Sequence, residues 1–227
     1  MTARYELAKR ALDIAGAAGI LLVTAPVSAY AAWRIKREDG GPLLYRGERI
    51  GRHGKPFAML KFRSMVLDAE RLGGPSTADD DPRLTVTGRM LRRYKLDELP
   101  QFLNVLTGEM SLVGPRPQVA SDVRRYTERE RLLLSVRPGI TDWASIAFRD
   151  EGAILAGRPD PDAAYDELIR PRKIALGLAY VESRTMRTDL KILALTAMAI
   201  AGVSRADKMI PAVDTAGHSP TSGPSLA

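Results

Sequence analysis

The sequence predicts a mostly α-helical, monotopic membrane protein that carries a small β-hairpin. An uncharged N-terminal run from Ile14 to Trp33 is interrupted by Pro26. Apolar stretches separated by glycines, between Leu43 and Phe62, predict two short strands. Much of the later chain places apolar residues at helical spacing. Together these observations predict a re-entrant helix broken at proline, a hairpin, and amphipathic helices that lie at the membrane interface.

The run from Ile14 to Trp33 spans about 20 residues, which as one helix is roughly 30 Å, the thickness of the hydrocarbon core. Pro26 removes one backbone hydrogen bond, so we expect a kink or break there. Basic residues flank both ends of the run, so the positive-inside rule gives no direction of crossing. A helix that enters the bilayer, breaks and returns to the same face satisfies both features. A cleaved signal peptide, with "VSA" at 27–29 as its cleavage site, and a simple single span are the alternatives.

The remaining elements follow in order. Strands are predicted at 43–45 and 57–62, a polar loop at 73–84, and two helices that meet near Asp97. A helix from Tyr165 to Tyr180 is interrupted at Pro171, and the segment Asp189 to Val203 suits either the membrane interface or the core. We therefore divide the chain into a re-entrant membrane helix (1–36), a second domain with interfacial helices (37–203) and a disordered tail (204–227).

Composition limits the chemistry. Lys and Arg outnumber Asp and Glu by 34 to 27, and this net charge of +7 favours anionic partners. The absence of cysteine excludes thiol nucleophiles and cysteine-ligated zinc, and only two histidines are present. No Walker A or dinucleotide motif is found. Aromatic residues make up 6% of the chain and no nucleic-acid motif occurs, so nucleic acid is not expected as a partner.

Two adjacent carboxylates, Asp97 and Glu98, are the strongest candidates for chemistry. Pro100 suits a first helical turn, which would put one of them at the positive end of a helix running through Phe102 and Leu106. Neighbouring residues on a helix point about 100° apart, so different roles are more natural than a shared one. Alone, the pair could be no more than favourable charges at a helix dipole.

Arginines near this pair favour a phosphate site. Arg92 lies upstream, Arg116 is held between two prolines, and Arg137 precedes Pro-Gly. A carboxylate that attacks phosphorus needs cations to neutralise the phosphoryl oxygens. The sequence therefore combines an acidic pair with the guanidinium groups that would make a phosphate approachable.

Three segments carry a family resemblance: "KFRSM" (61–65), "DDDPRLTVTGRMLRRYKLDELPQFLNVLTGEMSLVGPRP" (79–117) and "RPGITDWASI" (137–146). They resemble the bacterial sugar transferases, the monotopic phosphoglycosyl transferases that start glycan assembly on a polyprenyl phosphate. The resemblance extends over nearly the whole chain and is closest to the small, minimal form of the family.

The resemblance implies transfer of a sugar phosphate from a UDP-sugar to undecaprenyl phosphate, with Mg²⁺, at the bacterial plasma (inner) membrane with the catalytic domain facing the cytoplasm. It assigns Asp97 as nucleophile and magnesium contact and Glu98 as general base or geometry-setting partner. It places Lys61, Arg63, Arg92, Arg116 and Arg137 near the phosphates, and the proline of its re-entrant helix matches Pro26. Whether the enzyme forms a homodimer, and which sugar it uses, stay open.

Two positions depart from the family pattern. Ala25 stands where the family often has Ser or Asp before the proline, and Asp142 stands where Gly usually follows "RPGIT". The sequence leaves two alternative functions open: direct attack by lipid phosphate in a ternary complex, and a non-catalytic basic module that binds membrane lipid.

Overall fold

The computed structural model describes residues 3–74, 76–203 and 209–213. A long helix, α1 (Ala3–Asp39), is followed by β1 (Leu44–Ile50), β2 (Pro56–Phe62), α2 (Val86–Arg93), the 3₁₀ turn η3 (Leu96–Glu98), α3 (Gln101–Thr107) and β3 (Ser111–Val113). The second half contains α4 (Ala120–Arg124), the 3₁₀ turn η4 (Glu130–Ser135), β4 (Gly139–Thr141), α5 (Trp143–Ala147), α6 (Glu151–Leu155), α7 (Pro161–Leu168), α8 (Arg170–Ser183) and α9 (Met186–Ile200). The mostly helical fold is as predicted.

The predicted hairpin is confirmed. Strands β1 and β2 pair antiparallel, with Leu44 opposite Phe62 and Ile50 opposite Pro56. A second small sheet was not predicted: β3 and β4 pair in parallel, with Ser111 opposite Gly139 and Val113 opposite Thr141. These strands are three residues long each, too short for a periodic pattern to reveal.

The main core lies between α3, β3, α5, α8 and α9. Its largest members are fully or almost fully buried and come from elements far apart in sequence: Val105, Met110, Leu112, Trp143, Leu176, Tyr180, Ile192 and Leu195. Pro171 falls in the first turn of α8, so the predicted interruption between 165 and 180 is the boundary between α7 and α8.

Helix α9 answers the question left open for residues 189–203. Its Ile192, Leu195 and Ala199 are buried in the main core, while Leu190 and Ile200 are exposed. One face therefore packs in the core and the other is free. Most of the predicted tail (204–208 and 214–227) lies outside the described residues.

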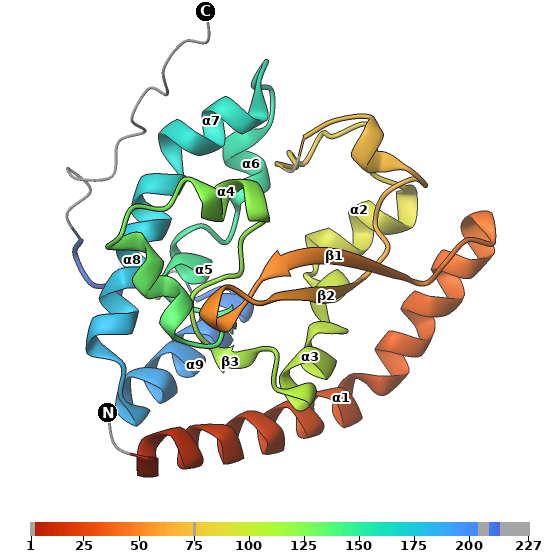
Figure 1. Cartoon of the computed structure of the whole chain (residues 1–227). Coiled ribbons are helices and arrows are strands. Elements are labelled where there is room, and N and C mark those ends of the chain that lie inside the picture. The colour runs from red at the N-terminus through yellow and green to blue at the C-terminus, as the bar shows by residue number, and fades with distance from the viewer. Residues whose placement is uncertain (1–2, 75, 204–208, 214–227) are drawn as a thin grey trace, which may run out of the picture.

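Helix α1 runs along one side of the molecule and changes direction along its length (Figure 1). It continues as α-helix through Pro26, so the prediction of a broken helix is wrong at the level of secondary structure. Pro26 has no amide proton to donate one turn back, and the Thr24 hydroxyl donates to the carbonyl of Ile20 at 2.7 Å, a contact that often bends helices. The chain thus accommodates the proline by bending.

Polar contacts fasten α1 to the rest of the fold. Asp13 accepts hydrogen bonds from the Ser111 hydroxyl and the Leu112 amide, both at 2.9 Å. Near the start of the helix, Tyr5 and Lys9 donate to the fully buried carboxylate of Asp189 on α9. Apolar contacts add to these, because Ala17, Ala31 and Ile35 of α1 are buried against the fold. Other apolar side chains of α1 are exposed, so the helix packs along one side and leaves an apolar face uncovered.

Among the described residues, α1 is the one helix long and apolar enough to cross a membrane. Leu22 and Val23 are each 78% exposed, close to Pro26. Tyr30 and Trp33 are about half exposed, and the guanidinium of Arg37 lies 5.3 Å from the centre of the Trp33 ring. Exposed aromatic residues next to basic ones are typical of a membrane–water interface. Association of this helix with a membrane is therefore physically reasonable.

Candidate active site

The acidic pair lies on the tight turn η3, between α2 and α3. Lys95 begins the turn with a left-handed backbone (φ 55°), and Pro100 caps the start of α3. A 3₁₀ turn has three residues per turn, so adjacent side chains point about 120° apart. Asp97 is consequently 4% exposed and faces the interior, whereas Glu98 meets a group of cations. The pair precedes the helix containing Phe102, close to where the sequence predicted it.

Glu98 is held by two cations. Its Oε1 accepts from Lys61 Nζ on β2 at 3.1 Å and from a terminal nitrogen of Arg116. Burial alone would raise the pKa of Glu98, but the charges of Arg116 and Lys61 and their hydrogen bonds outweigh burial and lower it below its usual range. Glu98 is therefore ionised and anchors both cations.

Asp97 has the opposite surroundings. Its Oδ1 is buried and has no hydrogen-bond partner in the structure. Burial raises the pKa of Asp97, and the negative charge of Glu98 raises it further, against the opposing charges of Lys61, Arg92 and Lys95. One carboxylate of the pair is thus neutralised by cations, and the other is left available.

The small parallel sheet positions Arg116. The amide of Gly114 donates to the Thr141 carbonyl, and the amide of Gly139 donates to the Pro115 carbonyl, both at 3.0 Å. A Cβ at Gly139 would lie 2.1 Å from the nitrogen of Gly114, so the two strands approach closely only because glycine occupies these positions. The segments "VGPRP" and "RPGIT" therefore pair with each other, and this pairing fixes the backbone position of Arg116.

The other predicted phosphate residues are placed differently. Arg92 contributes to the charge around Asp97, and a terminal nitrogen donates to the Thr77 carbonyl at 3.4 Å. Arg63 is buried in an ion pair with Asp39 at the end of α1, and its Nε donates to the Pro42 carbonyl at 2.8 Å. These contacts tie the end of α1 to the residue that follows β2, and the assignment of Arg63 as a phosphate ligand stays a prediction.

Arg137 also lies outside the Glu98 cluster. Its Nε donates to the carbonyl of Gly108, after the last residue of α3, at 3.0 Å. Its side chain lines a separate cavity together with Lys9 and Arg52. The structure therefore brings Lys61, Arg92 and Arg116 to the carboxylate pair, but not Arg63 or Arg137.

A magnesium ion would find few protein ligands here. In the part of the chain that the structure describes, no group of three or more acidic or histidine side chains could hold a metal. The free Oδ1 of Asp97 is nevertheless a suitable oxygen ligand. Mg²⁺ commonly binds through one or two carboxylates plus substrate phosphates, so the residues present fit such an ion.

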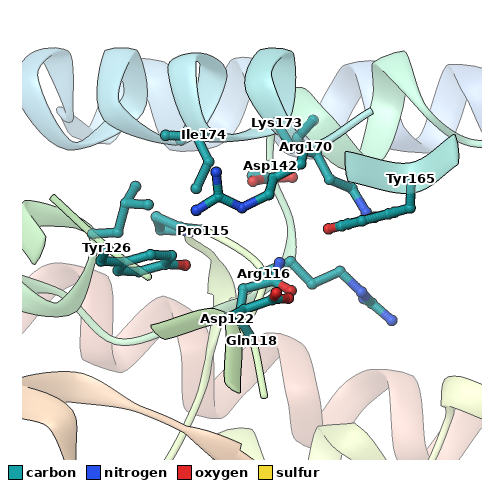
Figure 2. Close-up of a pocket in the computed structure, with 13 residues that line it drawn as sticks. Pro115, Arg116, Gln118, Asp122, Tyr126, Asp142, Tyr165, Arg170, Lys173 and Ile174 are labelled. Atoms are coloured by element: carbon teal, nitrogen blue, oxygen red, sulfur yellow. The ribbon is translucent and has the colours of Figure 1, made fainter. Parts of the chain in front are cut away.

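Sequence reasoning missed a cavity next to Arg116. It contains about 400 Å³ of empty space, including its opening to solvent, and lies between α4, α7 and α8. Figure 2 shows its polar lining, which includes Arg116, Asp122, Asp142, Arg170 and Lys173. One feature of the sequence could have pointed to this cavity: the basic residues at 170–173 surround Pro171, and the candidate phosphate residues Arg116 and Arg137 also stand next to prolines.

Comparison with known proteins gives the family. The model of the bacterial sugar transferase family matches residues 4–202, so this chain belongs to that family. It is 40% identical, over 84% of its length, to the UDP-glucose:undecaprenyl-phosphate glucose-1-phosphate transferase of Escherichia coli, and covers 39% of that protein. It is 36% identical, over 85% of its length, to the galactosyl transferase CpsE of Streptococcus agalactiae and covers 42% of it.

Shorter relatives match over most of both chains. The exopolysaccharide production protein ExoY of Sinorhizobium fredii is 32% identical over 86% of this chain and 85% of its own length. By contrast, the chain spans only about two fifths of the length of CpsE and of the galactose phosphotransferase of Salmonella typhimurium. The matched region therefore corresponds to a part of those longer proteins.

Proposed function

We propose that this protein transfers a sugar 1-phosphate from a UDP-sugar to a polyprenyl phosphate, releasing UMP and forming a polyprenyl diphosphate sugar. Family membership supports this activity, and the printed names of several relatives specify undecaprenyl phosphate as acceptor. One relative's name also specifies UDP-glucose as donor. The proposed reaction is a membrane step of glycan biosynthesis.

The single observation that carries the proposal is the unequal state of the adjacent carboxylates. Glu98 is paired with Lys61 and Arg116, while Asp97 keeps a buried oxygen without a partner. A nucleophile must have a free lone pair, and it must approach an anionic phosphate whose charge is offset by nearby cations. This arrangement supports Asp97 as nucleophile and Glu98 as the group that positions the cations.

The reaction then has two steps. An Asp97 carboxylate oxygen bonds to the sugar-bearing phosphorus, and the bond from that phosphorus to the bridging oxygen breaks, so UMP leaves with the electron pair. In the second step an oxygen of polyprenyl phosphate bonds to the same phosphorus, and the bond to Asp97 breaks. Lys61 and Arg116, which Glu98 holds beside the reacting carboxylate, would neutralise phosphoryl oxygens in both steps.

Asp97 would hold Mg²⁺ through its carboxylate, with the remaining ligands supplied by donor phosphates and water. When bound, the ion would offset charge on the diphosphate and favour the ionised form of the carboxylate. Asp97 itself is placed by its turn, and Arg92 and Lys95 add positive charge around it.

We also propose that α1 attaches the enzyme to one leaflet of the inner membrane, with the site facing the cytoplasm, where nucleotide sugars are found. The exposed Leu22 and Val23 beside Pro26 and the basic residues at both ends support this monotopic attachment. The bend at the proline would let both ends stay at one surface. A homodimer stays an open prediction.

The test is the intact mass of detergent-purified protein after incubation with Mg²⁺ and a panel of UDP-sugars, without lipid acceptor. We expect an added mass of one sugar phosphate, release of UMP, and neither in Asp97→Asn. Turnover by Asp97→Asn at a wild-type rate would contradict the nucleophile assignment. Product formed only when polyprenyl phosphate is present, with no adduct, would favour direct attack in a ternary complex instead. No reaction under either condition would favour a binding module.

A further inference from the structure

Gln101 carries a buried amide that forms no hydrogen bond within the protein. The residue is 0% exposed, and neither its Nε2 nor its Oε1 has a partner. Among the described residues, four buried side-chain polar atoms lack a hydrogen bond, and three of them belong to Gln101 and Asp97. Buried polar groups almost always have partners, so this concentration at one place in the chain calls for an explanation other than folding.

Gln101 lies about one helical turn after Asp97. The backbone of Leu99 and Pro100 is right-handed helical, so it continues the turn η3 into α3. Residues four apart on such turns are neighbours, and a glutamine in this relation to an aspartate can hydrogen-bond to it. Asp97 is 4% exposed and Gln101 is fully buried, so both side chains lie on the inner side of this segment. An unused donor and an unused acceptor are therefore neighbours at the proposed reaction centre.

Helix α3 is fixed against its surroundings, which keeps Gln101 inside. Asn104, about one turn further on, uses its amide fully: Nδ2 donates to the Ala58 carbonyl at 2.8 Å, and Oδ1 accepts from the Leu60 amide at 3.0 Å, both on β2. Near the other end of the helix, Arg10 of α1 donates to two of its carbonyls. The two buried amides of α3 therefore differ: Asn104 docks the helix on β2, and Gln101 is left unpaired.

We propose that Gln101 is a positioning residue for the proposed reaction: its Nε2 donates to the carboxylate of Asp97 while that carboxylate attacks and later leaves phosphorus. When one oxygen of Asp97 bonds to phosphorus, the other becomes the carbonyl oxygen of the acyl phosphate. A donor held against that oxygen fixes the orientation of the carboxylate in the first step. By drawing electron density from it, the donor makes the carboxylate a better leaving group in the second step.

No proton moves to or from the amide in either step. Gln101 acts through Asp97 and does not contact the substrate. The inference rests on the proposed function and adds a residue that the sequence pattern and the cation cluster did not point to.

The test variant is Gln101→Met, which keeps the length of the side chain and removes the amide. The measurement is the single-turnover rate of adduct formation, from intact mass, over a range of concentrations of the UDP-sugar that wild type prefers, with Mg²⁺ and without lipid acceptor. At saturating donor the rate should fall about 10- to 100-fold, the effect of one hydrogen bond to a charged group. The donor concentration that gives half the maximal rate should stay within about 2-fold of wild type, because the amide does not bind the donor.

Thermal unfolding of the same variant separates positioning from folding. Removing a buried amide that has no partner should leave the melting temperature unchanged or raise it. Asn104→Leu is the opposite case, because it breaks the bonds to β2 and should lower the melting temperature. Thr107→Val, at the last residue of α3, is the activity control: it removes a hydroxyl that donates to the Asn104 carbonyl, and its adduct rate should equal that of wild type.

Adduct formation by Gln101→Met at the wild-type rate would overturn the proposal. A fall in melting temperature together with the rate would also overturn it, because the amide would then support the fold. So would a large rise in the half-saturating donor concentration, because the amide would then contact the donor. If wild-type protein formed product without an adduct, Asp97 would not be the nucleophile and the inference would fail; if it formed neither, the proposed function would fail and this inference with it.

Discussion

Replacing Glu98 with glutamine tests whether this residue anchors the cations of the site. Glutamine keeps the shape and one acceptor oxygen but removes the charge that Lys61 and Arg116 contact. Burial lowers the pKa of Lys61, and Glu98 is the largest influence that opposes this shift. In Glu98→Gln the pKa of Lys61 should therefore fall further, and the two cations should repel without an anion between them.

The magnitude follows from charge, distance and exposure. Unit charges about 4 Å apart attract by about 4 kcal/mol at an effective dielectric constant of 20. All three side chains are about one-fifth exposed, and desolvation offsets much of the attraction. We expect Glu98→Gln to lower the free energy of unfolding by about 2 kcal/mol, which corresponds to about 4–8 °C in melting temperature for a chain of this size.

The assay is thermal unfolding in detergent of wild type, Glu98→Gln, Lys61→Met and the double variant. A coupling energy of about 1–3 kcal/mol between Lys61 and Glu98 is expected. Glu48→Gln, at an exposed position on β1, is the control and should leave the melting temperature unchanged. Additive effects within about 0.5 kcal/mol, or an unchanged melting temperature in Glu98→Gln, would refute the reasoning.

Three further predictions concern residues that support the fold outside the carboxylate pair. Asp189→Asn should destabilise the protein by about 3 kcal/mol, because Lys9 loses its buried counterion; limited proteolysis within α1 should accelerate, and unchanged digestion would contradict the tether. Burial raises the pKa of Asp142, so its ionisation lowers the free energy of unfolding as the pH rises above the pKa of an unfolded aspartate, near 3.9. Asp142→Asn should remove this pH dependence of stability, because asparagine does not ionise, and its side-chain oxygen can still accept from the Ser145 amide. Denaturation at several pH values checks it, and an unchanged slope would be inconsistent with a raised pKa. Pro26→Ala should straighten α1, so cysteines introduced at its two ends should become labelled from opposite sides of a vesicle; labelling from one side only, as in wild type, would oppose this.

Local signals predicted the elements that are set locally. Glycines and alternating residues predicted the hairpin, and Pro171 predicted the boundary between α7 and α8. The acidic pair was expected just before a helix, and it lies on the turn before α3. In each case the determining interaction lies within a few residues of the signal.

Long-range pairing was not predictable from the same signals. Arg63 pairs with Asp39, 24 residues away, and a basic motif cannot reveal that a guanidinium is already occupied. The parallel pairing of β3 with β4 depends on the close approach of Gly114 and Gly139, which the sequence presents as two unrelated turns. The cavity beside Arg116 is lined by Asp122 and Arg170 from separate helices, so it exists only after the core has assembled.

The unpaired state of Asp97 is hard to explain by stability alone. A buried carboxylate oxygen without a hydrogen bond costs about 1–3 kcal/mol, and the adjacent anion of Glu98 adds to the cost. Asparagine has nearly the same volume and would avoid burying the charge, so packing does not require an acid at this position. Glu98, in contrast, offsets the repulsion between Lys61 and Arg116 when no phosphate is present. The two adjacent residues of the turn therefore have different roles. The carboxylate of Glu98 holds Lys61 and Arg116 in place, and the carboxylate of Asp97 keeps an unpaired oxygen that the proposed reaction needs.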